Sequence, residues 1–384
     1  MKLTAQIKLL PTAEQARLLE QILEHANAAC NAISDYAWAN QVFNQFKLHK
    51  ALYTAIRQEF DLSAQVVVRC LGKVADSYKL DKKTKRTFKP HGSVAYDNRI
   101  LSYRQQSETV SIWVIGGRIA MPYQCGQRQR EMLTHQKGES DLFFQNGQFF
   151  LLATCEIDEP TPAEVKTFLG VDRGIVNIAV DSDGQRHSGS HINNVRHRQR
   201  RLRRKLKLKG TKSAKRLLRK LAHKEQRFAN DTNHCISKSI VVKAQGLDFG
   251  QVQGTGRGIA LETLKGIRDR ITARKSQRAT LHSWAFDDLE WKIAYKARMR
   301  GVWLVWVDPR NTSRTCPDCG CIDKQNRPSQ SRFKCVACGF SGLADHIAAL
   351  NIARRASVNR PYVSTTQSIA CGVGDKLPDL SGSS

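Results

Sequence analysis

The chain has 384 residues, of which 41% are hydrophobic, enough for two or three domains with sizeable cores. Its formal net charge of +28 favours a polyanionic partner but no particular fold. No apolar run approaches the length of a membrane span, and the N-terminus lacks the apolar stretch of a signal peptide. We therefore expect a nucleic-acid-binding protein of the cytosol rather than a membrane protein.

The N-terminal region begins with a strand and continues with helices. Residues 1–10 alternate apolar and polar side chains, a period typical of a half-buried strand. The segment Thr12-Ala-Glu-Gln15 then resembles a capping box, which opens a helix. Helical spacing of apolar residues predicts two more helices, over about 46–60 and 63–79. A small helical subdomain is expected here.

From about Phe88 to Ile157 the period changes to two. The pairs Gly116-Gly117 and Asn146-Gly147 separate short apolar runs and predict tight hairpins. Several short strands with tight turns predict a small β-barrel. Residues 1–10 would contribute its first strand, and the helices would be inserted into it.

Two strands of the second half of the chain end in a carboxylate. Asp172 closes the apolar run Phe168-Leu-Gly-Val, and strands at about 175–181 and 185–189 would continue a meander. Glu262 closes the run Gly258-Ile-Ala-Leu in the same way. The helix predicted at 281–300 also carries acids, which we interpret as surface charges (Asp287, Asp288, Glu290), and 302–307 is predicted as a buried strand.

The segment Arg196–Arg227 is very basic: 16 of its 32 residues are lysine or arginine, and Glu225 is its one acid. A sparse leucine stripe predicts a helical hairpin broken at Gly210-Thr211. A merely solvated charged face is disfavoured, because opposite charges for pairing along the helix are nearly absent. We expect the segment to bind phosphates. The candidate contacts are Arg200, Arg201, Arg203, Arg204, Lys205, Arg216, Arg219 and Lys220.

Two Cys-x-x-Cys-Gly motifs lie near the C-terminus. Their spacing predicts four thiolates around one structural zinc ion, in preference to chance motifs or redox dithiols. Each glycine allows a positive φ, so that backbone amides can point at a sulfur. Seven other cysteines, Cys321 among them, show no pairing pattern and are expected to be reduced thiols. The predicted zinc ligands are Cys316, Cys319, Cys335 and Cys338.

Asp345 follows these motifs and opens an apolar helical run. Taken alone it would be a helix cap. Together with Asp172 and Glu262, it can converge on one edge of a sheet. Such a cluster of carboxylates repels itself unless divalent cations bind, and two Mg²⁺ ions can share it.

These motifs resemble the OrfB/TnpB family of transposon-encoded RNA-guided DNA endonucleases, which are relatives of the type V CRISPR effectors. The resemblance rests on Gly-Val-Asp172-Arg-Gly, Ile-Ala-Leu-Glu262-Thr-Leu-Lys-Gly-Ile, Thr312-Ser313 and the Asp345 helix with its Ala-Ala-x-Asn-Ile. It is strongest over residues 165–356. One departure is Ile347, where many relatives carry an asparagine.

The resemblance implies an α/β RNase H-like domain of the RuvC type with an inserted zinc ribbon, plus an N-terminal β-barrel with an inserted helical subdomain. The implied division is a barrel (1–10 and 85–160), its inserted helices (11–84), a nuclease domain (165–313 and 341–356), a zinc ribbon (314–340) and a flexible C-terminal tail (357–384).

The implied activity is RNA-guided cleavage of target DNA next to a short motif. Asp172, Glu262 and Asp345 would be the catalytic acids and would hold two Mg²⁺ ions, with Mn²⁺ as an alternative. The implied partners are a guide RNA from the transposon end, one protein per RNA, and double-stranded DNA in the prokaryotic cytosol, at the nucleoid when target is bound. Two alternatives remain open: a guided repressor without nuclease activity, and a transposase or resolvase that uses no RNA.

Overall fold

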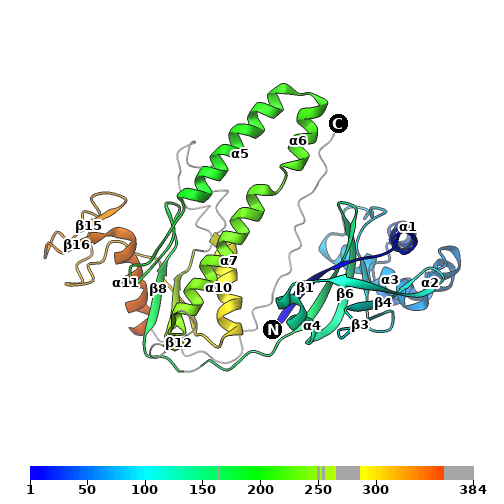
Figure 1. Ribbon diagram of the computed structural model, residues 1–384, viewed down its shortest axis with the longest axis horizontal. Helices are drawn as coiled ribbons and strands as arrows, with labels where there is room; N and C mark the ends of the chain where they lie inside the picture. The colour runs from blue at the N-terminus through cyan, green and yellow to red at the C-terminus, as the bar shows by residue number, and fades with distance from the viewer. Residues whose placement is uncertain (163, 249–250, 253–255, 265–285, 359–384) are drawn as a thin grey trace. The chain divides into compact units, whose positions relative to one another are not determined.

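The computed structural model describes residues 1–162, 164–248, 251–252, 256–264 and 286–358. The chain forms two compact units, one from Met1 to Asp158 and one that begins at Glu159 (Figure 1). No helix of the described part is both long and apolar enough to cross a bilayer. The predicted tail at 357–384 lies outside the described residues except for Ser357 and Val358, which belong to a helix.

The first unit contains a seven-stranded antiparallel sheet in the order β2-β6-β7-β1-β5-β4-β3. Its ends approach each other, because the Tyr103 hydroxyl on β3 donates to Ser140 Oγ on β6 at 2.8 Å. The sheet is therefore nearly closed, and the predicted barrel is confirmed in this form. The strands are β1 (Lys2–Leu9), β2 (Val94–Tyr96), β3 (Leu101–Arg104), β4 (Thr109–Val114), β5 (Gly117–Gln124), β6 (Gln136–Gln145) and β7 (Gln148–Glu156).

Both predicted hairpin turns are confirmed. Gly116 and Gly117 have φ of 90° and 136° between β4 and β5. Asn146 and Gly147 have φ of 51° and 77° between β6 and β7, as a turn with two left-handed central residues requires. The short helix α4 (Gln127–Leu133) was not predicted.

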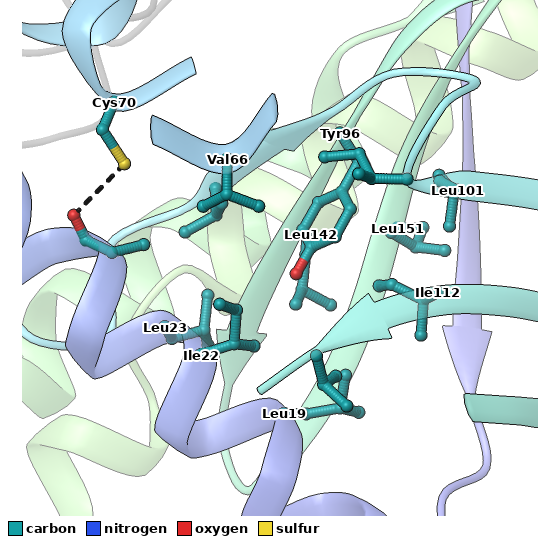
Figure 2. Close-up of a cluster of buried hydrophobic side chains, with 14 of the residues drawn as sticks. Leu19, Ile22, Leu23, Val66, Cys70, Tyr96, Leu101, Ile112, Leu142 and Leu151 are labelled. Atoms are coloured by element: carbon teal, nitrogen blue, oxygen red, sulfur yellow. Dashed lines mark hydrogen bonds between the residues drawn. The ribbon is translucent and has the colours of Figure 1, made fainter. Parts of the chain in front are cut away.

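The three predicted N-terminal helices are α1 (Ala13–Asn40), α2 (Gln45–Glu59) and α3 (Ala64–Leu80). The capping box is confirmed, since Gln15 N donates to Thr12 Oγ1 and Thr12 N to Gln15 Oε1. The core lies between these helices and the sheet. Figure 2 shows side chains that meet there, namely Leu19, Ile22, Leu23, Val66, Tyr96, Leu101, Ile112, Leu142 and Leu151.

The second unit is built on a five-stranded sheet in the order β10-β9-β8-β13-β14. The strands β8, β9 and β10 form an antiparallel meander, whereas β13 runs parallel to β8 and β14 parallel to β13. Because β8 and β13 are parallel, both end at the same edge of the sheet. The strands are β8 (Phe168–Asp172), β9 (Asn177–Asp181), β10 (Arg186–Ser188), β13 (Gly258–Glu262) and β14 (Leu304–Val307).

Helices cover both faces of this sheet (Figure 1). On one face, α7 (Lys224–Ala244) and α10 (Phe286–Met299) bury residues such as Ile240 and Ile293 against the strands. On the other, α11 (Ala344–Val358) packs Ile352 against Ala260 and Val305. The predicted helix at 281–300 is described from residue 286 on. The strand predicted as buried at 302–307 is an edge strand, and Trp306 is 41% exposed.

The basic segment forms α5 (Ser190–Lys209) and α6 (Lys212–Lys220). The predicted break is confirmed: Gly210 is left-handed at φ 62°, and Thr211 Oγ1 accepts from Ala214 N at the start of α6. A second break before α7, where His223 has φ 61°, was not predicted. The described part of the unit also contains two small two-stranded sheets, β11 (Leu247–Asp248) with β12 (Gln251–Val252), and β15 (Arg332–Lys334) with β16 (Ser341–Leu343).

Gly170 marks the closest approach of β8 and α11. A Cβ built there would lie 2.1 Å from Ala349 O and 2.5 Å from Ala353 N, both rigid backbone atoms. We predict that Gly170→Ala lowers the free energy of unfolding of the second unit by about 2 kcal/mol, because α11 must move away. Denaturant unfolding measures this change.

Gly72→Ala is the matched control, because the nearest atom there is Gln45 Nε2 at 3.3 Å, the end of a flexible side chain. It should be neutral or slightly stabilising, since alanine favours the helix. Equal stability of the two variants would contradict the close packing at Gly170.

Candidate active site and metal centre

A pocket of about 460 Å³ lies at the sheet edge where β8 and β13 end. Asp172 reaches it from the end of β8, Glu262 from the end of β13 and Asp345 from the first turn of α11. We call it the acid pocket. Its other lining residues are Arg173, Gly174, Ile175, Val176, Asn177, Pro309, Thr312, Ser313, Arg327, Gln330, Ser331, Ala344 and Ala348. The structure thus brings all three predicted acids to one pocket.

Burial and neighbouring carboxylates both disfavour negative charge in this pocket. Burial, together with the neighbouring carboxylates of Glu262 and Asp345, raises the pKa of Asp172 to about 8. Burial also raises the pKa of Glu262, although a hydrogen bond from Thr312 opposes that effect. Burial thus disfavours the ionised forms of Asp172 and Glu262, and a bound cation would offset that cost.

Glu262 is 8% exposed and is held by a neighbour that α11 positions. Thr312 Oγ1 donates to Glu262 Oε1 at 2.5 Å. The Asn351 side chain on α11 donates to the main-chain oxygens of Thr312 and Thr315, at 2.8 Å and 2.7 Å. Thus α11 supplies Asp345 directly and orients Glu262 through the Thr312 segment.

Asp345 is more than a helix cap, because Asn177 Nδ2 donates to its Oδ2 at 2.8 Å. The adjacent His346 does not line the pocket, and its Nε2 lies 3.1 Å from Ser182 O. Ile347 is 2% exposed and packs with Phe333 and Cys335. The departure from the family motif therefore makes an apolar contact between α11 and the cysteine-rich segment.

Sequence reasoning missed one basic residue of the acid pocket, Arg327. Arg327 Nη2 lies 4.0 Å from Asp345 Oδ1, and its charge opposes the upward shift of the Asp172 pKa. Arg327, Gln330 and Ser331 all come from the segment between the two cysteine pairs, so this segment forms one wall of the pocket. No local sequence signal marks such a contact, because it arises only when the segment folds back.

The interpretation of the α10 acids as surface charges is wrong for two of them. The Glu290 carboxylate accepts from the buried Arg173 at 2.6 Å and from Trp306 Nε1 at 2.8 Å. Asp288 accepts from Asn233 Nδ2 at 2.7 Å and pairs with Lys292. Only Asp287 among the three is an exposed residue. Each half-buried acid is bound to groups from other elements, which periodicity cannot reveal.

The four predicted zinc ligands lie together, with all sulfur atoms within 4.8 Å of one another. Cys316 Sγ is 3.6 Å from Cys338 Sγ, and Cys319 Sγ is 3.5 Å from Cys335 Sγ. A tetrahedral zinc ion with Zn–S bonds of about 2.3 Å needs sulfurs about 3.8 Å apart, so the cluster could hold one. The glycines that follow the two cysteine pairs, Gly320 and Gly339, have φ of 76° and 78°.

The amides at one cysteine pair do point at a sulfur. Hydrogen bonds from the backbone amides of Cys338 and Ala337 lower the pKa of the Cys335 thiol to about 6. A thiol with this preference for the thiolate is suited to a metal. The chemistry and spacing of the four sulfurs therefore fit zinc, while Cys321 stays outside the set.

The eight predicted nucleic-acid contacts lie on α5 and α6. Arg203 is half-buried and its Nη1 is 3.5 Å from Glu225 Oε2, the same carboxylate that Arg196 contacts at 3.4 Å. The other seven are exposed (Arg200, Arg201, Arg204, Lys205, Arg216, Arg219, Lys220). Their contact with nucleic acid stays a prediction.

Two family models match segments that lie mainly in the second unit. OrfB_IS605, described as "Probable transposase", matches residues 153–253, and "Cas12f1-like, TNB domain" matches residues 286–352. Together they contain Asp172, Asp345 and the four clustered cysteines. In these two segments the chain is similar to OrfB/TnpB and Cas12f1-like proteins.

Curated relatives of this chain include a CRISPR-associated endodeoxyribonuclease and a TnpB-like protein. The CRISPR-associated endodeoxyribonuclease Cas12f1 of Sulfoacidibacillus thermotolerans is 40% identical over 136 residues, which is 35% of this chain and 29% of that one. The TnpB-like protein MJ0751 of Methanocaldococcus jannaschii is 31% identical over 142 residues, 37% of this chain and 48% of that one. The matches span less than half of the length of these relatives.

Solved structures share the fold of this chain. A Cas12f1–sgRNA–target DNA complex matches with a TM-score of 0.58 at 15% identity, over 87% of this chain and 82% of that one. The mini-RNA-guided endonuclease CRISPR-Cas_phi3 matches with a TM-score of 0.55 at 10% identity, over 93% and 92%. The mixed α/β architecture with a nearly closed sheet is therefore shared with Cas12 effectors.

The raised pKa of Asp172 predicts how stability depends on pH without Mg²⁺. The unfolded carboxyl ionises at a pKa of about 3.9, whereas the folded one holds its proton to about 8. Between about pH 4 and 8 the folded state thus binds more protons than the unfolded state. Asp172 therefore makes the free energy of unfolding decrease as pH rises through this range. Asp172→Asn removes the penalty, so its Tm should exceed the wild-type Tm increasingly from pH 5 to 8.

Asp183→Asn is a control of opposite sign. Two hydrogen bonds from the Arg257 guanidinium lower the pKa of Asp183 to about 2. The ionised Asp183 therefore stabilises the folded state fully above about pH 4, and this stabilisation is lost as pH falls toward 2. Asp183→Asn should therefore lower Tm at every pH from 5 to 8. Differential scanning fluorimetry measures both, and a pH-independent Tm gap for Asp172→Asn would contradict the crowding of carboxylates.

Proposed function

We propose that this protein is a member of the OrfB/TnpB family and an RNA-guided DNA endonuclease that hydrolyses phosphodiester bonds in the acid pocket. The observation that carries the proposal is the convergence of Asp172, Glu262 and Asp345 on one pocket. Relatives that carry the name endodeoxyribonuclease, and a shared fold with a solved sgRNA–target DNA complex, support it.

Divalent cations fit the acid pocket chemically. Its donors are carboxylate oxygens, which suit hard ions such as Mg²⁺ or Mn²⁺. The carboxylate oxygens of the three acids do not all lie within 4.8 Å of one another. One ion could not contact all three acids at that spacing, so a pair of ions suits them better. Bound there, two Mg²⁺ ions would activate water and stabilise the leaving 3′ oxygen.

The chain's own residues would prepare this site. The hydrogen bond from Thr312 fixes one Glu262 oxygen and leaves the other for a ligand. Asn177 holds Asp345 Oδ2 and leaves Oδ1 toward the pocket, near Arg327. Arg327 would bind the scissile phosphodiester, since its guanidinium suits phosphate oxygens and is 30% exposed.

The finer fold assignment belongs to the same proposal. The order meander, helix, parallel strand, helix, parallel strand, helix supports an RNase H-like domain of the RuvC type over 165–313 and 341–356. The segment 314–340 would be a zinc ribbon with a structural ion, since its four cysteines leave no open ligand position. Residues 1–10 and 85–160 would be the barrel, with 11–84 as its inserted helices.

The partners would be a guide RNA from the transposon end, one protein per RNA, and double-stranded target DNA. Pairing would read the target sequence, and the protein would grip the backbone of the duplex. The exposed cations of α5 and α6 are candidates for that grip. The N-terminal unit would read the short motif beside the target, and the complex would act in the prokaryotic cytosol.

A guided repressor without nuclease activity is disfavoured by the presence of all three acids in one pocket. A transposase or resolvase that works without RNA would purify free of RNA, whereas a guided protein would not. Sequencing the nucleic acid that copurifies with the full chain separates these two classes. A plasmid-cleavage assay with Mg²⁺ then separates nuclease from repressor.

Substitution of any one acid should abolish cleavage and spare target binding. Asp172→Ala, Glu262→Ala and Asp345→Ala are each expected to reduce cleavage of a matched plasmid by about 10³-fold or more, because the acids act as one unit. Affinity for guide RNA should stay at the wild-type level. Undiminished cutting by Asp172→Ala would show that the acid pocket is not the active site.

Binding of nucleic acid should lose part of its salt dependence when α5 is neutralised. Arg200→Gln with Arg204→Gln should lower the slope of log affinity against log salt by about 2, one for each phosphate that is no longer neutralised. The control is Arg298→Gln, which removes one positive charge at a guanidinium that Glu159 already binds at 2.8 Å and 2.6 Å. An unchanged slope in the double variant would remove α5 from the interface.

A further inference from the structure

Arg173 is an unusual neighbour for a catalytic acid. It directly follows Asp172, lines the acid pocket, and its side chain is 0% exposed. Nη2 donates to the main-chain oxygen of Glu262 at 2.6 Å, and Nη1 donates to Glu290 Oε2 at 2.6 Å. One guanidinium therefore links the end of β8 to the end of β13, at the two residues that carry the acids.

Glu290 anchors this link from the other side. It lies on α10, and its second oxygen accepts from Trp306 Nε1 on β14 at 2.8 Å. The pair Arg173–Glu290 thus joins three strands, β8, β13 and β14, to one helix. Both carboxylate oxygens of Glu290 and both terminal nitrogens of Arg173 are used in these bonds.

Stability alone is a weak explanation for such a pair. Burying an arginine costs desolvation, and well-packed apolar residues often replace a buried ion pair without loss of stability. A planar guanidinium, however, fixes the direction of each bond it makes. The hydrogen bond from Arg173 to the Glu262 carbonyl constrains the backbone that carries the Glu262 side chain. Arg173 is also joined to Asp172 directly, because the two residues are adjacent in the chain.

We propose that Arg173 and Glu290 are a positioning pair that sets the spacing of Asp172 and Glu262 and thereby the affinity of the acid pocket for divalent ions. The inference rests on the proposed function and deepens it. Neither residue would touch the substrate or an ion. They act through the strand ends, in the way that residues behind metal ligands tune many metal sites.

The test is Mn²⁺ binding to the full chain, measured by electron paramagnetic resonance. Binding that is lost in Asp172→Asn identifies the pocket-bound ions. Arg173→Lys keeps the charge but loses the fork, and Glu290→Gln keeps the shape and the acceptor for Trp306 but loses the ion pair. Each is expected to weaken this binding by about 10-fold. The double variant should cost no more than either single change, because the pair acts as one unit.

Arg257→Lys is the matched control. Arg257 directly precedes β13 and forks onto Asp183 at 2.8 Å and 2.7 Å, but it does not line the acid pocket. It should lower Tm without changing Mn²⁺ affinity. If Arg173→Lys does not fold, the near-isosteric Glu290→Gln decides the test.

The outcomes separate the inference from the proposed function. Wild-type protein with no Mn²⁺ binding that depends on Asp172 would overturn the proposed function. Wild-type binding that Glu290→Gln leaves within about threefold would overturn the positioning pair alone. Loss of binding in both pair variants but not in Arg257→Lys supports the inference.

Discussion

The placement of three carboxylates at one pocket of the sheet edge is the constraint on which the second unit is built. The pKa of Asp172 is raised to about 8 because its burial, and then its carboxylate neighbours, disfavour a further negative charge. A fold that only maximised its own stability would not gather Asp172, Glu262 and Asp345 at one sheet edge. The arrangement persists because packing elsewhere fixes each acid, and the resulting strain is what gives the pocket its demand for cations.

The packing that holds these acids together is distributed over several elements. The parallel register of β8 and β13 places two acids side by side. Gly170 lets α11 lie against β8 at backbone contact distance, which brings Asp345 to the same edge. Asn351 then ties the Thr312 segment to α11, so that one helix governs two of the three acids.

The cysteine cluster takes part in this arrangement through its shape. Ile347 of α11 packs against Phe333 and Cys335, so the segment between the cysteine pairs is fixed to the helix that carries Asp345. That fixes Arg327 at the rim of the acid pocket, 4.0 Å from Asp345. A metal ion at the four sulfurs would thus have a structural role. By holding the segment between the cysteine pairs, it would also keep Arg327 at the acid pocket.

Local signals in the sequence predict their structures correctly, whereas long-range contacts escape them. The capping box at Thr12 and the turn at Asn146 are specified by adjacent residues, so pattern alone predicts them. The acids are expected to meet because each lies at the end of a predicted element, and the parallel pairing of β8 and β13 then places two of them at one edge. Two contacts join segments that are distant in the sequence, Arg327 with Asp345 and Arg173 with Glu290. No periodicity of the sequence encodes such contacts. The helix α4 escapes prediction because it is a single short element within an alternating region.

Locating bound metal tests the central claim most directly. Crystals of the full chain soaked in Mn²⁺, measured near the manganese absorption edge, would show where divalent ions bind. The account predicts anomalous peaks between Asp172, Glu262 and Asp345, and their loss in crystals of Asp172→Asn. An acid pocket that stays without anomalous density, while Mn²⁺ binds at other sites of the same molecule, would contradict it.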